Sequence, residues 1–138
     1  MIRIAVVEDE EYYVNQLTGY LNEYQKTEKE ELDITVYRDG DAVTAEYKSQ
    51  FDIILMDIQM KFVDGMTAAE EIRKMDSEVV IIFITNMTQY AIRGYEVDAL
   101  DYVLKPVSYF AFSQKLKRAV SRIKKRSSKY ITLAVKAA

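Results

Sequence analysis

The sequence predicts an α/β fold, a five-stranded parallel doubly wound sheet with helices on both faces, which makes a three-layer αβα sandwich. One observation is that short apolar runs of β type alternate along the chain with segments of helical periodicity. A second is that the runs at 53–56 and 79–84 are apolar on both faces, as central strands of a covered sheet are. Parallel strands joined by right-handed crossovers need helices on both faces. The strand order 2-1-3-4-5, common in sheets of this type, is assumed rather than worked out from the residues.

The predicted strands, in chain order, lie at 2–7, 33–37, 51–56, 79–85 and, as a weaker prediction, 99–104. Between them, apolar residues recur every three or four positions, which is the spacing of one helix face. This spacing predicts a helix around Val14, Leu17, Leu21 and Tyr24, another around Ala69, Ile72 and Met75, and a last one around Tyr109, Phe112, Leu116, Ala119 and Ile123. The segments 40–49 and 88–95 are weaker helix predictions.

The size and composition of the chain fit one domain, because 138 residues with 49% hydrophobic content can bury a sizeable core. We expect that domain to cover residues 1–124. The polar stretch KKRSSK at 124–129 has no apolar periodicity, and YITLAV at 130–135 reads as a strand with no later strand to pair with. Residues 125–138 are therefore expected to be a basic linker and the start of a further, missing domain.

Composition narrows the possible chemistry. The chain has no cysteine and no histidine, which excludes disulfides, thiolate and imidazole metal ligands, and imidazole bases. Oxygen ligands remain, and these suit hard cations such as Mg²⁺, Mn²⁺ or Ca²⁺. No apolar run approaches the roughly 18 residues needed to span a bilayer, and the start of the chain lacks the pattern of a signal peptide. We therefore expect a cytoplasmic protein without a membrane partner.

Charge is divided unevenly along the chain. Residues 1–101 carry a formal charge of −13, whereas residues 102–138 carry +10 and no acidic side chain. A basic end of this kind can contact nucleic acid or an acidic partner, but a solvated helix and linker is the simpler interpretation.

Acidic residues follow two of the predicted strands at the point where each strand ends. Glu8 and Asp9 follow the first strand, and Asp57 follows the third. Because the carboxyl ends of parallel strands meet in one crevice, we expect these three carboxylates to share a small volume. Two like charges about 4 Å apart repel by on the order of 4 kcal/mol at an effective dielectric near 20, so the group needs a proton, a cation or a lysine. Lys105 follows the last strand and can be that lysine; the alternative is that the aspartates only cap the following helices.

Five motifs in order resemble the receiver domain of two-component response regulators, over residues 2–124. They are VVEDE at 6–10, LMDIQM at 55–60, DG at 64–65, FIT at 83–85 and DYVLKP at 101–106. The resemblance implies a flavodoxin-like fold in which Asp57 accepts a phosphoryl group from a sensor histidine kinase. It also implies Mg²⁺ as cofactor, bound directly by Asp9 and Asp57, through water by Glu8, and by the backbone carbonyl of Gln59.

The same resemblance implies a switch rather than a turnover enzyme. Lys105, turned inward before a cis Pro106, would pair with a phosphoryl oxygen, and Thr85 would donate a hydrogen bond to it. Movement of Thr85 would let Tyr102 turn inward and reshape the face formed by helix 4, strand 5 and helix 5, which could also form a homodimer. The alternative for Tyr102 is simple packing on the edge of the sheet.

The segments 89–100 and 129–133 are most similar to regulators whose output domain is of the LytTR DNA-binding type. DNA would then be bound only by that output domain, which is absent from this chain.

Three residues depart from the family pattern, namely Lys61, Asn86 and Met87. Asn86 could narrow access to the phosphoryl group, and Met87, together with Gln59, could slow attack by water, so we predict a long-lived phosphoryl group. Two other classes fit poorly. An aspartyl-phosphate hydrolase would need a second acid in place of Gln59, and a flavin or nucleotide binder would not place the four acids 8–11 beside a phosphate. The alternative that stays open is a receiver-like interaction or dimerisation module that works without phosphorylation.

Overall fold

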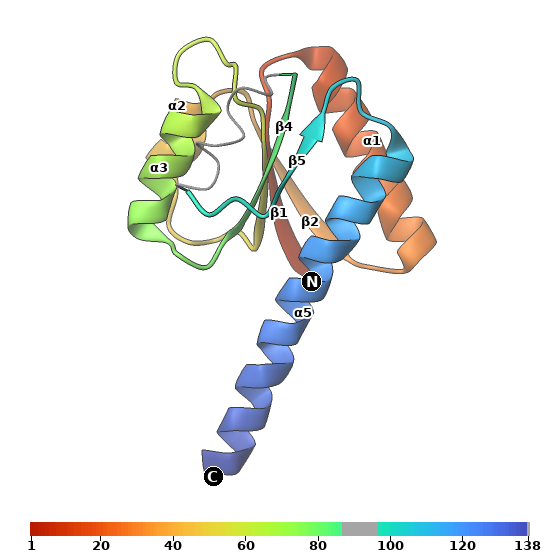
Figure 1. Ribbon diagram of the computed structural model, residues 1–138, viewed down its shortest axis with the longest axis vertical. Helices are drawn as coiled ribbons and strands as arrows, with labels where there is room; N and C mark the ends of the chain where they lie inside the picture. Colours follow the sequence, from red (N-terminus) through yellow and green to blue (C-terminus); the bar gives the residue numbers. More distant parts are fainter. Residues whose placement is uncertain (87–96, 138) are drawn as a thin grey trace.

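Five parallel strands form one sheet in the computed structural model, which describes residues 1–86 and 97–137 and places side chains as far as residue 127. The strands are β1 (Ile2–Val7), β2 (Leu32–Tyr37), β3 (Ile53–Met56), β4 (Val80–Thr85) and β5 (Asp101–Leu104). Their spatial order is β2-β1-β3-β4-β5, and every neighbouring pair is parallel (Figure 1). The predicted fold class and the assumed strand order are confirmed.

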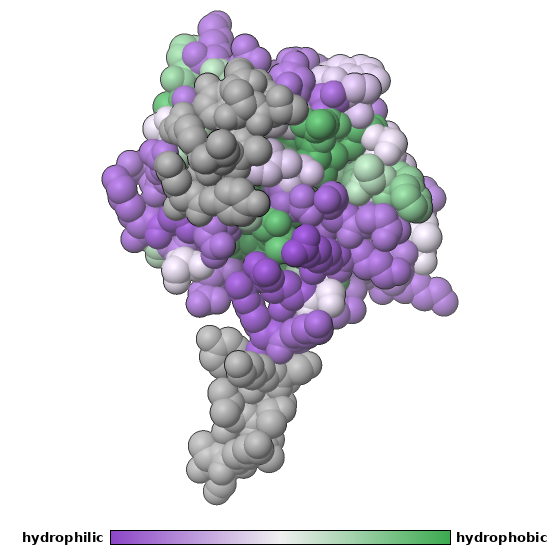
Figure 2. Space-filling model, in the orientation of Figure 1, coloured by the Kyte–Doolittle hydropathy of each residue, from purple (hydrophilic) through white to green (hydrophobic). Residues whose placement is uncertain are grey.

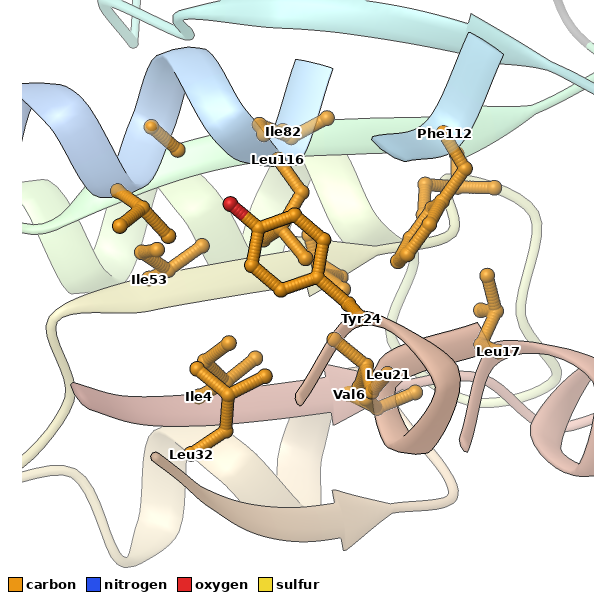
Figure 3. Close-up of a cluster of buried hydrophobic side chains, with 14 of the residues drawn as sticks. Ile4, Val6, Leu17, Leu21, Tyr24, Leu32, Ile53, Ile82, Phe112 and Leu116 are labelled. Carbon is orange, nitrogen blue, oxygen red and sulfur yellow. The ribbon is translucent and has the colours of Figure 1, made fainter. Parts of the chain in front are cut away.

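Helices cover both faces of the sheet (Figure 1). On one face lie α1 (Glu11–Glu28) and α5 (Tyr109–Ala137), and on the other lie α2 (Gly40–Ala45) and α3 (Gly65–Met75). The first face buries apolar side chains of both helices against strand residues (Figure 3), among them Leu17, Leu21, Tyr24, Phe112 and Leu116 against Ile4, Val6, Ile53 and Ile82. The second face packs Val43, Ala68, Ala69 and Ile72 against Ala5, Ile54 and Ile81. The central strands are therefore buried on both sides, as their continuous apolar sequences predict.

Strand register brings the carboxyl ends of the strands to one edge of the sheet. Val7 pairs with Met56, and Met56 pairs with Phe83, so the residues that follow β1 and β3 emerge side by side. Thr85 pairs with Leu104 at the far side of the same edge. Functional side chains from four strands therefore meet at this edge, where such sheets commonly bind ligands.

One predicted element is wrong. The segment 130–135 does not form a strand, because α5 continues without a break to Ala137. An unpaired strand leaves its backbone N–H and C=O groups without partners, whereas a helix satisfies them within the segment. The β propensity of this segment is therefore outweighed by hydrogen bonding within the helix. The helix predicted at 88–95 falls outside the described residues.

Ion pairs fix the middle of α5 to the body of the domain before the helix extends away from it. Lys124 Nζ lies 2.5 Å from Glu30, and Arg126 Nε lies 3.7 Å from Glu78, whose backbone carbonyl also accepts a hydrogen bond from the Arg126 guanidinium. On the face that Figure 2 shows, mostly hydrophilic residues lie where the helix leaves the body. None of the helices among the described residues combines the length and apolar character that crossing a bilayer requires.

Candidate functional site

The three predicted carboxylates converge at the edge of the sheet. Glu8 follows β1 and is 1% exposed, Asp57 follows β3 and is 4% exposed, and Asp9 is half-buried. One oxygen from each of the three lies within 4.8 Å of the others. Within the part of the chain whose side chains are placed, this is the one group of three acidic residues close enough to share a cation. The capping interpretation alone does not explain such convergence, and hard oxygen donors at this spacing fit Mg²⁺.

The backbone holds these side chains in place by extending the strand ladders. The Asp57 N–H donates to the Val7 carbonyl at 3.0 Å, and the Glu8 N–H donates to the Tyr37 carbonyl at 3.0 Å. The Lys105 N–H donates to the Thr85 carbonyl, also at 3.0 Å. Glu8, Asp57 and Lys105 are therefore each the first residue after a strand, held by one more ladder hydrogen bond.

Lys105 places a buried ammonium group beside the carboxylates of Glu8 and Asp57. Its side chain is 6% exposed, with Nζ 2.6 Å from Glu8 Oε1 and 3.4 Å from Asp57 Oδ2. The ring of Tyr13, on the first turn of α1, lies 3.9 Å from the same nitrogen. The Lys105–Pro106 peptide bond is cis, as the resemblance implied.

Burial changes the acid–base behaviour of the site. It raises the pKa of Glu8 to about 7, although the hydrogen bond from Lys105 opposes the shift and the charge of Asp57 adds to it. It also raises the pKa of Asp57, with Lys105 opposing. Burial alone would lower the pKa of Lys105, but Glu8 and Asp57 outweigh it and the net direction is upward. Two buried carboxylates therefore share one buried ammonium group, and the pKa of each carboxylate stays above its ordinary value.

A solvent-open pocket of about 480 Å³ gives access to these groups. Its wall includes Gln59, Lys61 and Asn86, three of the residues considered from sequence, together with Asp9, Asp57 and Lys105. Met87 falls outside the described residues. Lys61 and Asn86 therefore do face the pocket, where they can influence what enters it.

The loop between β3 and α3 forms one side of the pocket and is held in place by several hydrogen bonds. Asp64 caps α3 by accepting a hydrogen bond from the Thr67 N–H at 2.8 Å, and the Gly65 N–H donates to the Ile58 carbonyl at 2.7 Å. The buried carboxylate of Asp39 accepts from the N–H groups of Phe62 at 3.0 Å and Val63 at 2.8 Å.

Sequence reasoning missed both Asp39 and Tyr13. An aspartate directly before the glycine that opens α2 is a helix-capping signal, so the local role of Asp39 could have been found. Its contact with a loop more than twenty residues away could not, because that contact depends on the tertiary fold.

The two residues predicted to act as a switch lie on the neighbouring strands β4 and β5. Thr85 is buried at the end of β4. Tyr102 on β5 is half-buried, and its ring packs against that of Phe83 with 5.4 Å between the ring centres. Their switch role stays a prediction, and the packing of Tyr102 against Phe83 is equally that of a residue at the edge of the sheet.

Comparisons with known proteins agree with this geometry. The family model of the response regulator receiver domain matches residues 4–117. The sensory transduction protein LytT of Bacillus anthracis is 37% identical over 120 residues, covering 86% of this chain and 47% of LytT. The transcriptional regulatory protein LytR of Staphylococcus aureus is 31% identical over 129 residues, covering 93% of this chain and 49% of LytR. The crystal structure of TrrA from Thermotoga maritima in complex with Mg²⁺ and BeF has a TM-score of 0.72 at 28% identity, covering 86% of this chain and 99% of TrrA.

These relatives also bear on the type of regulator. The chain spans about half the length of the curated relatives that it matches. The predicted kinship with LytTR-type regulators is confirmed by LytT and LytR. With a receiver fold, converging carboxylates and a family match over most of its length, this chain belongs to the response regulator receiver domain family.

Proposed function

We propose that Asp57 is the phosphoacceptor and that Mg²⁺ assists the transfer. The observation that carries the proposal is the convergence of three carboxylates and one buried lysine at the carboxyl edge of the sheet. Asp9 and Asp57 would bind the ion directly, Glu8 through water, and Gln59 through its backbone carbonyl. When bound, the ion supplies the positive charge that phosphoryl transfer needs beyond what Lys105 provides. TrrA, crystallised with Mg²⁺ and BeF, supports the assignment.

The transfer itself uses groups of this chain. A carboxylate oxygen of Asp57 attacks the phosphorus of a phosphohistidine on the sensor kinase, an O–P bond forms and the N–P bond breaks. The electron pair of the broken bond returns to the imidazole nitrogen, which takes up a proton. Lys105 would then leave Glu8 to pair with a phosphoryl oxygen, and Thr85 would donate a hydrogen bond to another.

The output step would follow from the new charge. A phosphoryl group adds about −1.5 to −2 charges and new acceptor oxygens, which would attract the Thr85 hydroxyl as a hydrogen-bond donor. Tyr102 would then turn inward and change the face that includes β5 and α5. This face would control a DNA-binding output domain and could pair two receivers as a homodimer; a role without phosphorylation, as an interaction module only, is the alternative.

A direct test is incubation with acetyl phosphate and Mg²⁺, followed by intact-mass measurement. We expect a mass gain of one phosphoryl group in the wild type and none in Asp57→Asn. Asp64→Asn, which changes the half-buried cap of α3 at the other end of the loop, is the matched control and should still be labelled. Absence of labelling in the wild type, from both acetyl phosphate and a histidine kinase, would favour the interaction module.

The phosphoryl group is expected to persist for minutes or longer in magnesium buffer, because Asn86 lines the pocket with Asp57 and would narrow the access of water to the phosphoryl group. Asn86→Ala should shorten its lifetime by opening that path. The decay of the ³²P label after removal of the phosphodonor measures the phosphoryl lifetime in the wild type and in the Asn86→Ala variant. Loss of the label from the wild type within seconds would contradict the prediction.

A further inference from the structure

The aromatic ring of Tyr13 contacts the ammonium group of Lys105. Tyr13 lies on the first turn of α1, is half-buried, and lines the pocket with Asp9, Asp57 and Lys105. Its ring centre is 3.9 Å from Lys105 Nζ, well inside the roughly 6 Å limit for attraction between a cation and an aromatic face. Neighbouring Tyr12 is 67% exposed and touches Tyr13 edge to face, with 5.1 Å between ring centres. Only the second of these two tyrosines therefore reaches the site.

The ring completes the surroundings of the ammonium group. An ammonium has three N–H donors. The carboxylates of Glu8 and Asp57 lie 2.6 Å and 3.4 Å from the Lys105 nitrogen and can each accept from one donor. The centre of the Tyr13 ring lies 3.9 Å from the same nitrogen and can interact with the third donor. With a side chain 6% exposed, Lys105 has almost no water to take the place of the ring.

We propose that Tyr13 is a positioning residue for phosphoryl transfer, holding the Lys105 ammonium over the pocket while that ammonium moves from Glu8 toward the phosphoryl group on Asp57. This inference rests on the proposed function. The ammonium is now 0.8 Å closer to Glu8 than to Asp57, so phosphorylation requires a short displacement. A carboxylate would hold the ammonium in one direction, whereas an aromatic face attracts it over a broad area and permits that displacement. The ring therefore keeps the lysine in the pocket without fixing it on either carboxylate.

The test compares three single variants by affinity for beryllofluoride in magnesium buffer, which mimics the phosphoryl group on Asp57. Tyr13→Leu keeps apolar bulk but removes the aromatic face, and should weaken binding about tenfold. Tyr13→Phe keeps the face and should stay within about twofold of wild type. Tyr12→Leu makes the same change one residue away and is the matched control, with no loss expected. Thermal unfolding of each variant confirms that it is folded.

A double-mutant cycle separates positioning from general packing. If Tyr13 acts through Lys105, then Tyr13→Leu should cause no further loss of affinity in a Lys105→Met background. Affinity unchanged by Tyr13→Leu, or a tenfold loss that persists without Lys105, would overturn the proposal.

Proton NMR can test the contact between Tyr13 and Lys105 without phosphorylation. In the metal-free protein, the ε-methylene protons of Lys105 should resonate upfield of those of the other lysines because of the Tyr13 ring, and Tyr13→Leu should remove that shift. Failure of the wild type to bind beryllofluoride would reject the proposed function and the positioning role with it, whereas an unshifted Lys105 in a protein that does bind would reject the contact alone.

Discussion

Replacement of Lys105 by methionine is expected to lower the free energy of unfolding of the metal-free protein by about 3 kcal/mol near pH 8, because breaking a buried ion pair leaves a charge uncompensated. Methionine keeps the length and apolar character of the lysine stem, so the change removes mainly the charge. That charge lies 2.6 Å from Glu8 and 3.4 Å from Asp57, both buried. Denaturation by urea in the presence of a chelator measures the loss, and added Mg²⁺ should recover part of it.

The loss should depend on pH in a definite direction. The pKa of Glu8 is raised from 4.5 to about 7 in the folded protein, so the folded state holds this proton more firmly than the unfolded chain. The resulting stabilisation is present below about pH 4.5 and is lost as pH rises to about 7. Without Lys105 the ionised Glu8 has no cation, so the variant should lose more stability near pH 8 than near pH 5.5.

A lysine on the same pocket wall provides the control. Lys61 is exposed, and its substitution by methionine should change stability by no more than about 0.5 kcal/mol at either pH. Equal stability of the Lys105 and Lys61 variants near pH 8 would show that the buried carboxylates do not depend on Lys105.

The sequence was sufficient to predict the edge of the sheet where the site lies. Glu8, Asp57, Thr85 and Lys105 each stand at or directly after the end of an apolar run, and parallel strands must bring such positions together. That rule depends only on alternation of strands and helices, which the apolar pattern shows clearly. The strand order had to be assumed from what is common in doubly wound sheets, because alternation alone does not fix which strands are neighbours, and the metal-binding roles came from resemblance.

Contacts between distant segments could not be predicted in the same way. Tyr13 is one of 11 tyrosines, and nothing in its spacing indicates that the first turn of α1 faces the residue after β5. Asp39 shows a capping signal, but its hydrogen bonds to Phe62 and Val63 exist only once α2 and the β3–α3 loop have packed together. The strand predicted at 130–135 failed for a related reason, since a strand needs a partner that local propensity does not supply.

The site also carries a cost in stability that a purely structural protein would avoid. Two carboxylates are buried with one lysine between them, and burial raises the pKa of both. Active sites commonly hold such unfavourable arrangements because function requires them. Other contacts therefore have to hold the β3–α3 loop beside the site. The Asp39 carboxylate and the close packing of α3 on the backbone of Asp57 provide them.

Substitution of Gly65 by alanine is expected to destabilise the protein by about 3 kcal/mol or more, through overpacking against rigid backbone. A Cβ atom at this position would lie 1.9 Å from the carbonyl oxygen of Asp57 and 2.9 Å from the Cα of Ile58. Neither contact can be relieved by a side-chain rotation, so either the start of α3 or the backbone of Asp57 must move. Because Asp57 is the proposed phosphoacceptor, the variant should also bind beryllofluoride more weakly.

The same substitution at Gly19 is expected to have the opposite effect on stability. It lies inside α1, and a Cβ there meets nothing within 4 Å. Alanine at this position should stabilise the protein by about 0.5 to 1 kcal/mol, because glycine is the poorer helix former. Urea denaturation of the two variants side by side measures the difference. If the Gly65 variant proved as stable as the Gly19 variant, the tight packing of α3 on the phosphoacceptor backbone would be refuted, and with it the explanation of why glycine follows Asp64 in the DG turn.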